Sequence, residues 1–186
     1  MNLKHEDQTR RTAIIASFTA LCIGTNYIML PFPNVKVMDA IIFTTGLFFG
    51  RASGIFVAIM SWLVYGVLNP LGFTMPTLLT VILCETIYAL SGNLLRRTSS
   101  GNPKNSINSL ERSIIFGVVG LFSTLSYDII TNAVYGLLFY DSVWLGLLTM
   151  NVPFPLGIIH EASNFFLFAT ITPVLLQFLS REINIK

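Results

Sequence analysis

Four ionisable residues stand inside long apolar stretches of this chain, where a charged side chain is costly to bury: Glu85, Asp128, His160 and Glu161. Within a membrane span such groups contact a substrate, relay protons or pair with one another, so each is a functional candidate. A buried carboxylate without a partner becomes protonated or leaves the apolar phase. We therefore expect these side chains to share one polar site.

The residues around the first two candidates follow helical spacing. Asp128, Asn132 and Tyr135 stand at positions i, i+4 and i+7, which lie on one face of a helix. Tyr88 follows Glu85 at i+3 and shares its face in the same way. Each segment thus presents a carboxyl group together with side chains that can form further hydrogen bonds.

A third segment contributes His160 with Asn164 four residues later, and Glu161 beside them. At about 1.5 Å per helical residue, the polar groups of all three segments lie about 14–20 Å from the same membrane surface. We therefore predict one pocket that opens toward the outer side, with tyrosines such as Tyr27 and Tyr127, and Trp144, as flat walls. The candidate substrate-binding residues are Glu85, Tyr88, Asp128, Asn132, Tyr135, His160, Glu161 and Asn164.

Other interpretations of these residues remain open. The polar groups could join the helices by hydrogen bonds without any ligand, or they could form a proton relay. His160 and Glu161 are adjacent and cannot chelate one metal ion from a single helical face, so we predict no metal site and no cofactor. The spacing His160-x-x-x-Asn164 is similar to the last motif of the CAAX-type membrane proteases, but their paired glutamates are missing. We therefore predict no catalytic residue.

Composition indicates a protein that crosses a membrane several times. Hydrophobic residues make up 53% of the 186 and charged residues only 11%, against about 25% charged in soluble domains. We predict an all-α bundle of six transmembrane helices over residues 12–182, after an N-terminal segment 1–11 and before a tail 183–186. A polar linker over 96–111 interrupts the bundle, and Trp62 is assigned to packing or to the lipid face. The expected spans are 12–30, 35–50, 54–68, 76–95, 112–140 and 153–179.

The basic residues lie almost entirely on one side of these spans. Only Lys36 falls on the other side, and cytoplasmic loops carry the excess of Lys and Arg in membrane proteins. Both termini are therefore predicted to be cytoplasmic, in a multi-pass protein of the cell (plasma) membrane, and the scattered charges do not indicate nucleic-acid binding. The residues on the predicted cytoplasmic side are Lys4, Arg10, Arg11, Arg51, Arg96, Arg97, Lys104, Arg112, Arg181 and Lys186.

Small residues form two ridges at helical spacing. Ala16, Ala20 and Gly24 stand four apart in the first span, and a second ridge runs from Gly46 through Gly50 and Gly54 to Ala58. Such ridges allow another helix to approach closely. The first ridge could pack inside the bundle or serve as a docking face for another membrane subunit, whereas the second is better explained by internal packing.

Nearly the whole chain resembles the substrate-binding S-components of energy-coupling factor (ECF) vitamin transporters. The resemblance rests on six spans in a short chain, on Ala16 and Ala20, and on Asp39 followed by the glycine-rich segment 46–66, GLFFGRASGIFVAIMSWLVYG. Many members have a proline where this chain has Arg51. The polar residues of the last three spans complete the pattern.

The resemblance implies a function and partners. S-components bind a vitamin or precursor from outside and dock through the first helix, here at Ala16, Ala20 and Gly24, on a transmembrane coupling subunit driven by two ATPases. This chain has no GxxxxGK[ST] phosphate loop of its own. Thiamine-like, pterin-like, flavin and corrinoid ligands all suit acidic, amide and aromatic groups. A structural or morphogenetic membrane protein, an intramembrane enzyme and a proton-coupled carrier are the alternatives.

Overall fold

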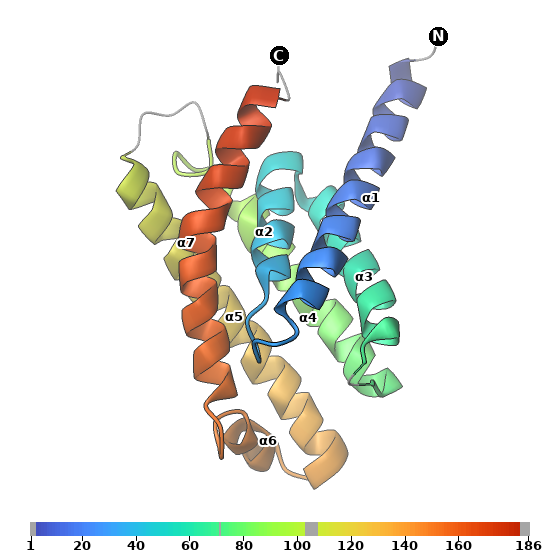
Figure 1. Cartoon of the computed structure of the whole chain (residues 1–186), viewed down its shortest axis with the longest axis vertical. Helices are drawn as coiled ribbons and strands as arrows, with labels where there is room; N and C mark the ends of the chain where they lie inside the picture. Colours follow the sequence, from blue (N-terminus) through green and yellow to red (C-terminus); the bar gives the residue numbers. More distant parts are fainter. Residues whose placement is uncertain (1–2, 71, 103–107, 183–186) are drawn as a thin grey trace.

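The structure is a computed structural model that describes residues 3–70, 72–102 and 108–182, with side chains from residue 8 onward. Every regular element in these residues is a helix, which confirms the predicted all-α class (Figure 1). The predicted tail 183–186 and residues 103–107 of the predicted linker lie outside the described residues. The helices are α1 (Leu3–Met29), α2 (Val37–Phe49), α3 (Arg51–Leu68), α4 (Met75–Leu95), α5 (Ser109–Tyr140), α6 (Val143–Thr149) and α7 (Leu156–Glu182).

Five of these helices, α1, α3, α4, α5 and α7, are long and apolar enough to cross a membrane. The segment expected to form the second span is a helix of only 13 residues, whereas about 20 are needed to cross the hydrocarbon layer. Its length alone therefore does not establish a sixth span. The chain is a multi-pass membrane protein by the other five.

Two boundaries differ from the sequence expectation. The first helix already begins at Leu3, so most of the segment expected to precede the membrane domain is helical. The fifth connection contains the extra helix α6, because Asp141 takes a left-handed conformation that ends α5, and the Ser142 side chain accepts a hydrogen bond from the Leu145 N–H at 3.3 Å.

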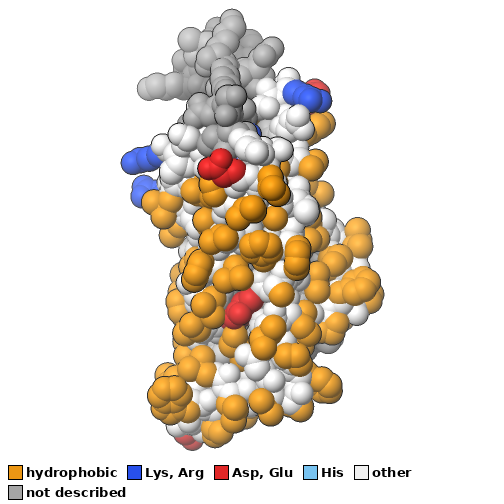
Figure 2. Space-filling view, turned by 90° about the vertical axis from the view of Figure 1, so that its left-hand side faces the viewer, with side chains coloured by type: hydrophobic (Ala, Val, Ile, Leu, Met, Phe, Trp, Pro, Cys, Tyr) orange, Lys and Arg blue, Asp and Glu red, His pale blue; other side chains and the backbone are white. Residues whose placement is uncertain are grey.

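The bundle has two chemically different ends. The start of α1 and the end of α7 lie together, with the α2–α3 turn and the α4–α5 connection; we call this the terminal end (Figure 1). Figure 2 shows Lys and Arg side chains at this end and a broad belt of hydrophobic side chains below it. The opposite end, the loop end, carries the α1–α2 and α3–α4 connections, α6 and Lys36. Which end faces the cytoplasm remains a prediction.

The core is built around α2. Residues 38–48 are all buried, as expected for a short helix that is apolar on every side. It contacts α1, α3, α4 and α7. Glycines permit this: a Cβ on Gly46 would strike the Ala89 backbone, and one on Gly92 would strike the Phe43 carbonyl. In the structure the second small-residue ridge therefore packs inside the bundle, as expected.

Close packing also holds α5 against α7. A Cβ on Gly120 would come within 2.8 Å of the Phe168 side chain, and one on Gly117 within 2.9 Å of the Phe165 carbonyl. The two long helices therefore approach closely, which brings their polar residues face to face toward α2.

Candidate functional site

His160 lies at the centre of a buried polar cluster. Its Nδ1 is 3.0 Å from Oδ1 of Asp128 on α5, and its Nε2 is 2.9 Å from Oδ2 of Asp39 on α2. The His160 residue is 1% exposed, Asp39 0% and Asp128 4%. One side chain of α7 thus joins the short buried helix α2 to the longest helix, α5.

This geometry constrains where the protons of the cluster lie. An ionised carboxylate only accepts hydrogen bonds, so both imidazole nitrogens can face carboxylates only if both carry hydrogen or if one Asp is protonated. In either arrangement at least two protons are shared among Asp39, His160 and Asp128. Removal of one of these side chains would leave a buried ionisable group without its partner, which is energetically expensive.

Amide and hydroxyl groups extend the cluster to a fourth helix. The Asn164 amide donates hydrogen bonds to Asp39 Oδ2 at 2.7 Å and to Thr124 Oγ1 at 2.8 Å. The Tyr88 hydroxyl donates to the same Thr124 oxygen at 3.2 Å. The result is one continuous hydrogen-bonded series across α2, α4, α5 and α7, which we call the buried polar chain. Its members are Tyr88, Thr124, Asn164, Asp39, His160 and Asp128.

Glu85 has a separate partner. The Trp62 indole N–H donates a hydrogen bond to its Oε2 at 2.8 Å, and Glu85 is fully buried. Its Oε1 has no hydrogen-bond partner among the described residues, and the same is true of Oδ1 of Asp39. Each carboxyl group therefore retains an unused acceptor inside the bundle.

Two cavities lie toward the loop end from the buried polar chain. One, of about 240 Å³, is lined by the end of α1, the α1–α2 connection and α3, including Asn26, Trp62 and Tyr65. The other, of about 270 Å³, is lined by α5, the end of α6 and the start of α7, including Asp128 and Asn132. Both are lined by Asn34 and Lys36 as well.

Lys36 contacts the aromatic walls of both cavities. Its Nζ lies 5.2 Å from the Trp62 ring centroid and 5.4 Å from that of Tyr127. An ammonium within about 6 Å of such a ring face is attracted by the ring quadrupole. The side chain of Lys36 therefore stands between the two cavities and covers part of two aromatic faces.

The α1–α2 connection closes over this region. Pro31 and Pro33 prevent helix α1 from continuing, and Asn34 takes a left-handed conformation with φ of 56°. The Asn34 side-chain amide donates to the Leu156 carbonyl at 3.0 Å, so the connection is held against the start of α7.

The predicted substrate-binding residues fall into three groups. Asp128, His160 and Asn164 lie together in the buried polar chain, with Tyr88 at its far end. Of the predicted set, only Asp128 and Asn132 line a described cavity. Asn132 also donates to the Asp128 carbonyl at 2.8 Å.

Among the described hydrogen bonds, none joins the other predicted residues to the buried polar chain. Glu85 is buried against Trp62, and Glu161 is half-buried on another face of α7. Tyr135 is 37% exposed and packs against Phe139, with ring centroids 4.5 Å apart. Among the described contacts, neither Glu161 nor Tyr135 joins the buried polar chain.

Sequence reasoning missed the residues that complete the site. Asp39 and Lys36 were placed at the outer end of a span without a role, and Trp62 was assigned to packing or lipid. An acidic residue in the first turn of a helix that has no other charged residue is a signal that could have identified Asp39. Trp144, expected as a wall, is 81% exposed instead.

The first small-residue ridge lies on the outside of the molecule. Ala16, Ala20 and Gly24 are exposed, and a Cβ on Gly24 would meet nothing within 4 Å. Helix α1 turns its other face, with Phe18 and Cys22, to the core. The ridge is thus not used for packing within the described part of the chain.

Residues 6–181 match the family model described as "ECF-type riboflavin transporter, S component". No curated protein and no solved structure matches the chain. The family match covers almost the full length and agrees with the resemblance carried by Ala16, Ala20 and the glycine-rich segment 46–66. The chain therefore belongs to the ECF-type riboflavin transporter S component family, whose members are substrate-specific, non-catalytic subunits of a membrane transporter.

Proposed function

We propose that this chain captures riboflavin or a closely related neutral flavin from the outer side of the cell membrane. The ligand would enter at the loop end and occupy the space lined by Asn34, Lys36 and the aromatic rings around them. The observation that carries this proposal is the position of Lys36 against both Trp62 and Tyr127, with a cavity on either side. The family description, which names riboflavin, supports the choice of a flavin.

The lining of the two cavities suits a flat heterocycle with hydroxyl groups. Trp62, Tyr65 and Tyr127 offer aromatic faces for stacking, and such faces favour offset contact with a planar ring. Asn26 and Asn132 offer amide groups that both donate and accept hydrogen bonds. Lys36 is the one cation in the lining of these two cavities as described, so a strongly anionic ligand is disfavoured.

The volumes of the two cavities indicate that one ligand occupies both of them. Sites for drug-sized ligands occupy about 300–1,000 Å³. The two cavities hold about 240 and about 270 Å³, so neither reaches this range alone and the two together do. We infer that the ligand displaces the Lys36 side chain from the two rings and fills both of the cavities that this side chain separates.

The buried polar chain then has two roles. Its Asp128 end borders the larger of these cavities and would accept hydrogen bonds from ligand hydroxyl or imide groups. The remainder, from His160 to Tyr88, holds four helices in register beneath the ligand. Glu85, which meets the indole N–H of Trp62, would fix the orientation of a stacking ring.

Energy for transport would come from partner subunits. We propose that the exposed ridge of Ala16, Ala20 and Gly24 docks on a transmembrane coupling subunit that is driven by two ATPases. The ridge is free of contacts from the described part of the chain and lies on a helix that is only lightly buried. In this arrangement both termini are cytoplasmic, and the loop end faces outward, as the positions of the basic residues favour.

The test is thermal unfolding of the purified chain in detergent with riboflavin, thiamine, folate and a corrinoid in separate samples. A ligand present at 100 times its dissociation constant stabilises the folded state by about 2.7 kcal/mol, which is visible as a higher melting temperature. We expect this shift with riboflavin and a quench of flavin fluorescence as the ring stacks on Trp62.

The other outcomes separate the parts of the proposal. A shift with a different vitamin alone would retain a substrate-binding subunit and overturn the flavin assignment. No shift with any of the four, in a preparation that melts cooperatively, would overturn the assignment of the site. The Trp62→Phe variant separates stacking from the hydrogen bond to Glu85. It keeps an aromatic face for the ligand and loses only that hydrogen bond.

A further inference from the structure

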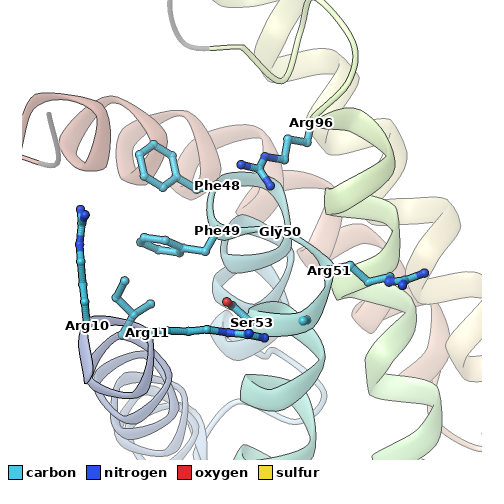
Figure 3. A pocket seen from close by; sticks show the side chains of 10 residues that line it. Arg10, Arg11, Phe48, Phe49, Gly50, Arg51, Ser53 and Arg96 are labelled. Carbon is cyan, nitrogen blue, oxygen red and sulfur yellow. The ribbon is translucent and has the colours of Figure 1, made fainter. Parts of the chain in front are cut away.

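The largest cleft described in the molecule lies at the terminal end, far from the candidate substrate site. It has a volume of about 550 Å³ and lies between the start of α1 and the α2–α3 turn, beside the end of α4 (Figure 3). Its lining residues are Arg10, Arg11, Ile14, Phe48, Phe49, Gly50, Arg51, Ala52, Ser53 and Arg96.

Guanidinium groups from two separate helices converge on this cleft. Figure 3 shows Arg11 extended from α1 toward Ser53, Arg10 projecting from the same helix in another direction, and Arg96 reaching from the end of α4 over Gly50. A Cβ at Gly50 would lie 2.6 Å from Arg96 Nη1, so the glycine makes room for this guanidinium. The Arg51 side chain points away from the others. No Asp or Glu occurs among the described lining residues.

The wall of the cleft is apolar. Phe48 and Phe49 both project from the end of α2 toward α1, with ring centroids 4.9 Å apart, and Ile14 of α1 also lines the cleft. Phe49 also meets Phe18 of α1 edge to face at 5.4 Å. The cleft therefore combines a cationic rim with an aromatic and aliphatic wall.

We propose that this cleft binds the phosphate group of an anionic phospholipid from the leaflet that the terminal end faces. Arg10 and Arg11 directly precede the apolar part of α1, so the rim lies at the level of lipid headgroups. Arginine binds phosphate through paired N–H groups, and basic pockets between helices at this level bind anionic lipid headgroups. The Ser53 hydroxyl adds a further donor on the turn.

The apolar wall distinguishes a lipid from a free anion. A soluble phosphate compound would use the guanidinium rim and make no use of the apolar wall. A phospholipid uses both parts, because its acyl chains continue along the exposed apolar face of α1 beside the cleft. This proposal requires only that the chain lies in a membrane, and it is independent of the identity of the transported substrate.

The experiment is native mass spectrometry of the full chain released from detergent, titrated with dioleoyl-phosphatidylglycerol or dioleoyl-phosphatidylcholine. We expect one tightly retained phosphatidylglycerol and weaker binding of phosphatidylcholine. In the Arg11→Gln/Arg96→Gln variant we expect affinity for phosphatidylglycerol to fall by about fivefold for each guanidinium removed. The matched control is Arg97→Gln/Arg181→Gln, which removes the same charge from the same end, at residues that do not line the cleft, and should keep the wild-type affinity.

Several results would overturn the proposal. Equal binding of the two lipids, or an equal loss in the control variant, would leave no specific lipid site. Displacement of phosphatidylglycerol by millimolar inorganic phosphate would assign a free-anion site instead, and displacement by an acidic peptide would assign a protein-docking site. Since Arg96→Gln could disturb the α2–α3 turn, Arg10→Gln/Arg11→Gln provides a second variant, with its melting temperature in phosphatidylcholine as the check on folding.

Discussion

Asp39 and His160 stand 121 positions apart and meet through a 2.9 Å contact between Oδ2 and Nε2. This contact joins α2, the most buried helix, to α7, whose length crosses the bundle. Because Asp128 approaches the other imidazole nitrogen, His160 links three helices at one point. Asp128 also lines one of the cavities at the loop end, so the cluster connects the stability of the bundle with the shape of the proposed substrate site.

Replacement of His160 should strongly destabilise the fold. In His160→Gln the side chain can no longer satisfy both Asp39 and Asp128, and loss of one partner from a buried ionic group costs about 3–5 kcal/mol. The measurement is the midpoint of thermal or denaturant unfolding in detergent. Ser163→Ala, on the same turn of α7, is the control and should melt close to the wild type.

A combined variant separates charge from packing at this site. If Asp39→Asn and Asp128→Asn are added to His160→Gln, no buried carboxylate is left unpaired, so part of the lost stability should return. Strictly additive losses across the three substitutions would contradict a coupled cluster.

Substitution of residues that line the larger loop-end cavity should weaken ligand binding, while the protein still folds. Asn132→Ala removes an amide that lines the larger loop-end cavity, and the loss of one ligand hydrogen bond corresponds to about tenfold in affinity. Asp128→Asn should act in the same direction. Titration of flavin fluorescence measures both, and Asn93→Ala at the terminal end is the matched control. Wild-type affinity in well-folded variants would remove these residues from the site.

Lys36 offers a test of how the two cavities join. In Lys36→Ala the Trp62 and Tyr127 rings are no longer covered by an ammonium, so a flat ligand should bind about threefold more tightly or better. Lys36→Arg keeps a cation over the rings and should bind like the wild type. Weaker binding in the alanine variant would instead make Lys36 a direct ligand contact.

The exposed ridge of α1 should matter for transport and not for binding. Ala16→Trp places a large side chain on a surface that the described chain leaves uncovered, so binding of the substrate should survive while uptake into cells or vesicles with the partner subunits stops. Leu21→Trp, on an exposed but different face of the same helix, is the control. Normal uptake by the Ala16 variant would contradict docking at this ridge.

Much of the fold followed from local properties of the chain. Long apolar segments bounded by Pro31, Asn69 or the polar linker predicted the membrane helices, because turn residues and charge are local signals. The expected second span, 35–50, is a helix of 13 residues, Val37–Phe49, and its crossing of the membrane stays a prediction. An apolar helix of 13 residues and a longer span look alike in composition when the helix is buried in protein rather than in lipid.

The site was harder to predict because its partners come from different helices. Asp128, His160 and Asn164 were recognised individually, since ionisable or amide groups in apolar segments stand out. Asp39 stands out less, because acids are common near a helix start and only the apolar character of the rest of its helix marks it. Trp62 resembles any packing aromatic and carries no signal without its neighbours.

The sequence by itself determined the membrane class, the sidedness of charge, the family and the presence of buried polar groups, because each depends on residue type and spacing along one helix. Only the tertiary structure decided that Asp39 meets His160, that Trp62 meets Glu85 and that Lys36 separates two cavities. These contacts depend on which glycine faces let the helices approach and on the angle at which they cross, and no single helix contains that information.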